Sequence, residues 1–74
     1  MLTKKQKITL EAIECFIKEK GYSPTIREIA EMTETTIGPT FQKVFILEKL
    51  GYISTDNGKA RTIKILKSIE EVEE

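Results

Sequence analysis

The fold is decided by residues 24–50, which read PTIREIAEMTETTIGPTFQKVFILEKL. Thr25 followed three residues later by Glu28 is typical of a capping box, in which the two side chains satisfy unpaired N–H groups at a helix start. The polar residues 33–36 then interrupt the apolar pattern. We therefore predict a helix of about two turns after Thr25, a short turn, and a second helix.

The second helix of this pair is expected to begin between Ile37 and Pro39, because proline suits the first turn of a helix. Gly51 is expected to stop it at about Leu50. By the period of about 3.6 residues, one face of this helix is apolar enough to enter a core. That face carries Thr40, Val44, Leu47 and Gly51.

Residues 3–21 predict another helix upstream of the pair. Thr3 and Gln6 form a second capping box, so the helix should begin at about Lys4, and Gly21 should end it. The expected apolar face comprises Ile8, Ala12 and Phe16, broadened by Ile13 and Ile17.

Downstream of the pair the sequence predicts a hairpin. Residues 52–55 are β-prone, residues 56–58 read as a turn, and residues 61–66 alternate with Ile63 and Ile65 on one face. The fold class is therefore mainly α with a small β-hairpin, a winged helix-turn-helix of three helices and a two-stranded wing. We expect one domain over residues 1–67 and a disordered acidic tail over residues 68–74.

The composition excludes several function classes. The 74 residues contain one cysteine, Cys15, and no histidine, so disulfide frameworks, structural zinc and histidine-based catalysis are excluded. We expect no enzymatic activity, no cofactor and no metal. The longest apolar run, residues 44–47, is far below the ~20 residues of a membrane span, and no apolar signal core is present. These features predict a cytoplasmic protein without a membrane partner.

The charge is zero overall but unevenly distributed. Residues 59–67 carry four basic residues and no acid, whereas residues 68–74 carry four glutamates. A basic folded body is what a nucleic-acid-binding protein needs. Lysines can also serve to protect an exposed strand edge from aggregation, and charge does not separate the two interpretations.

The face of residues 37–50 opposite the expected core contains the candidate base-reading side chains. It carries Gly38, Gln42, Phe45, Ile46 and Lys49, with Phe41 and Lys43 at its borders. Gln42 is a candidate reader of adenine, because its amide can donate and accept at one base edge, although an exposed glutamine can equally contact only water. Thr36 can contact DNA or cap the helix.

Three basic side chains are candidates for phosphate contacts. Arg27 stands at the start of its helix, where it can bind phosphate or pair with Glu31 four residues on. Lys59 and Arg61 follow the hairpin turn and are expected to project from the tip of the wing toward DNA.

Residues 21–30, GYSPTIREIA, resemble the Gly-x-Pro-Pro-(Ser/Thr)-x-Arg-Glu-Ile segment of the LexA family. Residues 47–53 and 59–66 also resemble the end of the third helix and the wing of that family's DNA-binding domain. The resemblance covers about residues 2–66. It implies a winged helix that binds operator DNA, with the family's base-contacting positions occupied by Thr36, Gly38, Pro39, Phe41 and Gln42.

The departures from the family pattern leave the operator sequence open. Ser, Asn, His or Glu usually stand where this chain has Gly38, Pro39, Phe41 and Phe45, and the family's serine protease domain does not follow within these 74 residues. We expect a transcriptional regulator that binds double-stranded DNA as a homodimer, because one small domain gives little affinity. The alternative is a winged helix that binds another protein through the apolar side chains of Phe41, Phe45 and Ile46.

Overall fold

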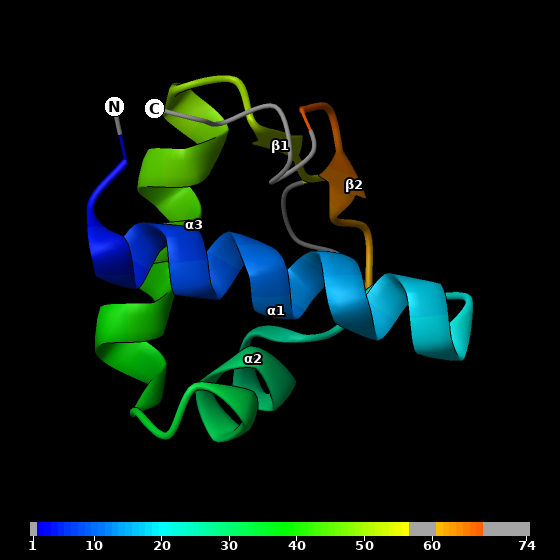
Figure 1. Cartoon of the computed structure of the whole chain (residues 1–74), viewed down its shortest axis with the longest axis horizontal. Coiled ribbons are helices and arrows are strands. Elements are labelled where there is room, and N and C mark those ends of the chain that lie inside the picture. The colour runs from blue at the N-terminus through cyan, green and yellow to red at the C-terminus, as the bar shows by residue number, and fades with distance from the viewer. Residues whose placement is uncertain (1, 57–60, 68–74) are drawn as a thin grey trace.

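The computed structural model describes residues 2–56 and 61–67. It contains α1 (Lys4–Lys20), α2 (Ile26–Met32), α3 (Ile37–Lys49), β1 (Ile53–Ser54) and β2 (Lys64–Ile65). In Figure 1, α1 crosses in front of α3, with α2 and the β1–β2 hairpin on opposite sides of α1 in this view. The predicted order of three helices and a two-stranded wing is confirmed. The expected disordered tail and most of the predicted hairpin turn lie outside the described residues.

The helix ends follow from the local chemistry of the sequence. At Thr3 and at Thr25 both hydrogen bonds of a capping box form, with Gln6 and Glu28 as the partner residues. Gly21 closes α1 in the left-handed conformation, with φ of 83°, and donates its N–H to the carbonyl of Ile17 at 2.8 Å. Glycine takes this conformation without the steric cost that a Cβ brings. The predicted starts and ends of the helices are confirmed within one residue.

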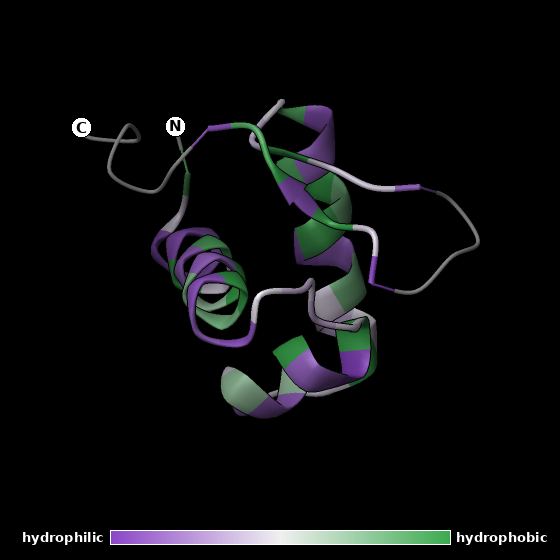
Figure 2. Cartoon of the chain, turned by 90° about the vertical axis from the view of Figure 1, so that its right-hand side faces the viewer, coloured by the Kyte–Doolittle hydropathy of each residue, from purple (hydrophilic) through white to green (hydrophobic). Residues whose placement is uncertain are grey.

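The core lies where the three helices meet the hairpin. Figure 2 shows hydrophobic segments on the inner side of α1 and along α3. The predicted core residues Thr40, Val44 and Leu47 of α3 are buried, as is Ile63 beside β2. The core comprises Leu2, Leu10, Ile13, Ile29, Val44, Leu47, Ile53 and Ile63.

The predicted apolar face of α1 is wrong in part. Ile8 is 46% exposed, whereas Thr9, Leu10 and Ile13 are buried. Ile8–Ala12–Phe16 and Leu10–Ile13–Ile17 are two overlapping apolar stripes, each with helical spacing. Packing against the rest of the core selects the stripe that contains Leu10 and Ile13.

The hairpin is shorter than predicted. β1 and β2 pair antiparallel over two residues each, with Ile53 opposite Ile65 and Ser54 opposite Lys64. Beyond the ladder, the Tyr52 carbonyl accepts the N–H groups of Leu66 at 2.8 Å and Lys67 at 3.0 Å. The hairpin and its flanking residues, 52–56 and 61–67, are called the wing below.

Candidate nucleic-acid interface

A tight turn joins α2 to α3 and fixes the two helices as a pair. The N–H of Thr35 bonds to the carbonyl of Ala30 at 2.9 Å, and Glu34 takes the left-handed conformation with φ of 57°. Ile29 of α2 packs in the same buried cluster as Val44 and Leu47 of α3. The outer side of α3 is therefore presented by a rigid support.

The outer side of α3 is exposed, as its periodicity predicts. Phe41 is 59% exposed and Phe45 is 51% exposed. Lys43, placed at the border of the face, is half-buried. The remaining exposed residues of this side are Gly38, Pro39, Gln42, Ile46 and Lys49.

Thr36 is the N-cap of α3, but its side chain makes no capping hydrogen bond. Its carbonyl accepts the hydroxyl of Thr40 at 2.8 Å. The exposed Thr36 side chain is therefore available to contact a ligand.

The charge carried by α3 is positive. Its basic residues are Lys43 and Lys49, and its one acid is Glu48. Glu48 is half-buried and accepts a hydrogen bond from the Thr55 hydroxyl at 3.1 Å. The ammonium of Lys49 lies 5.4 Å from the ring centroid of Phe45, which is a cation–π contact.

Arg27 is exposed in the first turn of α2. No ion pair between Arg27 and Glu31 forms within the described part of the chain, where the ion pairs are Lys18–Glu14 and Arg61–Glu28. The guanidinium of Arg27 is therefore not paired with Glu31, the residue four positions on that its spacing suggested as a partner.

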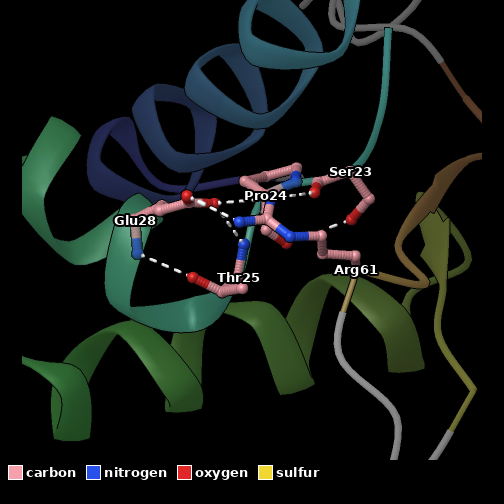
Figure 3. Close-up of polar contacts among 5 residues, drawn as sticks. All are labelled: Ser23, Pro24, Thr25, Glu28 and Arg61. Carbon is pink, nitrogen blue, oxygen red and sulfur yellow. Dashed lines mark hydrogen bonds and ion pairs between the residues drawn. The ribbon is translucent and has the colours of Figure 1, made fainter. Parts of the chain in front are cut away.

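Arg61 does not project from the tip of the wing, so this sequence-based expectation about its geometry is wrong. Its guanidinium turns back to the start of α2 and donates two hydrogen bonds to the Glu28 carboxylate, at 3.0 and 2.9 Å (Figure 3). It also donates to the Ser23 carbonyl at 3.1 Å and lies 4.9 Å from the ring centroid of Tyr22. A planar guanidinium suits this combination of a two-point carboxylate contact and an aromatic face.

The Arg61–Glu28 pair favours the charged form of both side chains. The hydrogen bonds from Arg61 lower the pKa of Glu28, helped by the backbone N–H of Thr25. Conversely, the Glu28 carboxylate raises the pKa of Arg61.

The backbone of Arg61 is in the left-handed conformation, with φ of 58°, which costs a residue with a Cβ about 1–2 kcal/mol. These side-chain contacts offset that cost.

Ser23 forms the second connection between the wing and the loop before α2. Its buried hydroxyl accepts the N–H of Ile63 at 3.0 Å and donates to the Pro24 carbonyl at 3.0 Å. Together with the Arg61 contacts, this bond fixes the angle between the wing and α2. We call these contacts of Ser23, Glu28 and Arg61 the wing latch.

A groove of about 640 Å³ lies between α3, the wing and the start of α2. Phe41, Phe45 and Lys49 line it from α3, and Thr55, Arg61 and Thr62 line it from the wing. Lys59, a predicted phosphate contact, lies outside the described residues. Among residues 2–56 and 61–67, no group of acidic or cysteine side chains is arranged to hold a metal ion. No helix in these ranges is long and apolar enough to cross a membrane.

The helix pair, exposed positive third helix and adjacent wing define the class of winged helix-turn-helix DNA-binding domains. The comparison with known families agrees, because the model of the LexA DNA binding domain matches residues 1–62. The chain belongs to this family.

The chain is also similar in sequence to individual LexA repressors. The chain is 44% identical over 68 residues to the LexA repressor of Thermotoga maritima, covering 92% of this chain and 34% of that protein. It is 39% identical over 66 residues to the LexA repressor of Leptospira biflexa, covering 89% of this chain and 33% of that protein. The chain thus spans about a third of the length of these curated relatives. The alternative of a protein-binding winged helix is not favoured by these matches.

Proposed function

We propose that this chain is the operator-binding part of a transcriptional repressor, and that it binds double-stranded DNA sequence-specifically. The observation that carries the proposal is the outer side of α3, which is exposed and held by α2 in the helix-turn-helix arrangement. A major groove about 12 Å wide admits one helix, so α3 can present this side to base edges. The relatives named above are repressors, which supports regulation of transcription as the outcome.

The roles of the contacting residues follow from position and chemistry. Gln42 is proposed to pair with an adenine edge, and Thr36, Gly38, Pro39 and Phe41 to approach the bases near the start of α3. Arg27 and Lys43 are proposed to contact phosphates on either side. Lys59 keeps its proposed phosphate contact on the basis of its charge.

Arg61 receives a different proposed role from the one suggested by its sequence position. Its guanidinium is engaged by Glu28 and Ser23, so a phosphate would have to displace a two-point ion pair. We propose that Arg61 positions the wing rather than contacting the duplex. Arg61→Lys should then weaken binding at every sequence by loosening the wing, with little change in the salt dependence.

Selection of bound duplexes from a random DNA pool, at fixed and stated salt, tests the proposal. Sequence-specific binding predicts that one motif is enriched and that its affinity exceeds that of a scrambled duplex by roughly 10³-fold or more. Enrichment without a motif would indicate general phosphate binding, and no enrichment would refute DNA binding by this chain. The scrambled duplex at the same salt is the control, because phosphate contacts alone already bind weakly.

A further inference from the structure

The outer side of α3 is unusually apolar for a surface proposed to read DNA. Phe41 and Phe45 are more than half exposed, and Ile46 is 37% exposed. Among the exposed side chains within α3, Gln42 provides the amide that can read a base by hydrogen bonding. The side chains of α3 that could read guanine are lysines, and the guanidinium of Arg61, which lines the same groove, is engaged by Glu28 and Ser23. Side chains that can read a base by hydrogen bonding therefore make up a small part of the outer side of α3.

We infer that Phe41 and Phe45 form a specificity-determining pair that reads the C5-methyl groups of thymines in the major groove. This inference rests on the proposed function and specifies the class of DNA sequence that the chain prefers. The thymine methyl is the apolar group that a base pair displays in the major groove, and apolar side chains are known to contact it. With Gln42 on adenine, the preferred half-site is rich in A·T pairs.

The spacing of the two rings fits neighbouring base pairs. Phe41 and Phe45 are four residues apart, which is about one turn or 5.4 Å along the helix axis. Base pairs rise about 3.4 Å per step, so one turn of α3 corresponds to one or two steps. Both rings line the groove beside the wing, and their spacing of four residues places them on one side of α3. The two methyl groups should belong to base pairs one or two steps apart.

A lysine beside the rings favours a duplex over a second copy of this chain. The exposed ammonium of Lys49 lies 5.4 Å from the Phe45 ring centroid, whereas Glu48, which lines the same groove, is half-buried and bonded to Thr55. Two copies that met through this face would bring like charges together, which is unfavourable. Phosphates on both sides of a major groove would instead attract Lys49 while the rings contact the methyl groups.

Uracil substitution tests the inference directly, because uracil is thymine without the methyl group. In the duplex preferred by the full chain, each thymine is replaced in turn by uracil and the affinity is measured. At two positions, which lie one or two base-pair steps apart, we expect a loss in affinity of about fourfold per methyl, the cost of one buried CH₂ group. Phe41→Ala and Phe45→Ala should each abolish the loss at one of these positions.

The controls separate this inference from the proposed function. Leu66→Ala removes an equally exposed apolar side chain from the wing and should leave the response to uracil unchanged. Circular dichroism verifies that the exposed phenylalanine variants remain folded. A duplex that is bound specifically but shows no response to uracil would overturn the inference while leaving DNA binding intact. A response that survives in both phenylalanine variants would also overturn it.

Self-association of the chain through the outer side of α3 is a further outcome that the tests must distinguish. If the chain sediments as a dimer without DNA, and Phe45→Glu makes it monomeric, then the face is a protein interface and thymine reading is wrong. Absence of any preferred duplex would remove both the proposed function and the inference built on it.

Discussion

Glu28 combines two tasks, because it completes the capping box of α2 and receives Arg61 from the wing. The hydrogen bonds from Arg61 lower the pKa of Glu28 from its ordinary value of 4.5. A carboxyl with a lowered pKa stabilises the fold above its unfolded-state pKa, and this contribution is lost as the pH falls through the folded-state value. The wing latch should therefore weaken in acid.

Glu28→Gln isolates this effect, because glutamine also serves at the third position of a capping box but carries no charge. We expect the variant to be less stable than the wild type at neutral pH, and the difference to vanish as the pH falls below the lowered pKa. Urea unfolding at a series of pH values measures it. Glu31→Gln, an exposed neighbour on α2, is the control. An equal difference for Glu28→Gln at every pH would show that the charge of Glu28 does not matter.

Gln42 and Arg27 are the residues proposed for the two kinds of DNA contact, to a base and to a phosphate. Replacing Gln42 by alanine should cost about 1–3 kcal/mol on the preferred duplex alone, because a base contact carries sequence information. Replacing Arg27 by alanine should weaken all duplexes alike and reduce the salt slope by about 0.9. Salt titrations on preferred and scrambled duplexes measure both effects, with Arg27→Lys as the charge-preserving control. Equal losses on both duplexes for Gln42→Ala would assign no base to this residue.

At the scale of elements, the left-handed glycine that ends α1 sets the path of the chain into the helix pair. Apart from its two chain neighbours, a Cβ at Gly21 would meet no atom within 4 Å, so the cost of a side chain there comes from the left-handed backbone and not from a clash with the rest of the fold. We expect Gly21→Ala to destabilise the fold by about 1 kcal/mol. Thermal or urea unfolding measures the change. Lys20→Ala, at the last helical residue, is the control and should lie within about 0.5 kcal/mol of the wild type.

The wing depends on Ser23, which lies outside it in the sequence. The buried Ser23 hydroxyl is the acceptor for the N–H of Ile63, and alanine would leave that N–H without its partner. We expect Ser23→Ala to cost about 1–3 kcal/mol and to speed hydrogen exchange of the Ile63 amide. Ser54→Ala within β1 is the matched control. An unchanged exchange rate at Ile63 would show that the wing is held without this bond.

The elements that were predictable from the sequence are those defined by local chemistry. The capping boxes at Thr3 and Thr25 and the glycine at position 21 act within a few residues, so they locate the helix ends. The outer side of α3 was also predictable, because its core face has a clear period. The buried stripe of α1 was not, since Ile8 and Leu10 belong to overlapping stripes and packing chooses between them.

The contacts of the wing latch could not be predicted from the sequence, for a different reason. Glu28 and Arg61 are 33 residues apart, and their contact exists only when the wing lies against the start of α2. The sequence does contain a weak signal. Arg61 follows a turn and Glu28 stands in a motif shared with the family, but nothing in the two segments alone pairs one with the other.

The small size of the domain limits how tightly one copy can bind DNA. The described part of the chain measures 30 × 23 × 22 Å, comparable to one turn of the DNA duplex. Single modules of this kind bury only about 600–1,000 Å² of protein surface on DNA. High affinity should therefore require two copies on adjacent half-sites, which is the basis for proposing a homodimer on DNA.

The spacing of half-sites tests this proposal. Two copies related by two-fold symmetry should bind best when half-site centres are about 10–10.5 base pairs apart, or a multiple of it, because both α3 helices then face the same side of the duplex. Adding five base pairs rotates one half-site by about half a turn and should remove the gain over a single site. Binding isotherms on single, in-phase and out-of-phase duplexes at one salt concentration measure the gain. If all three duplexes give the same affinity per half-site, the copies bind independently and this chain does not dimerise on DNA.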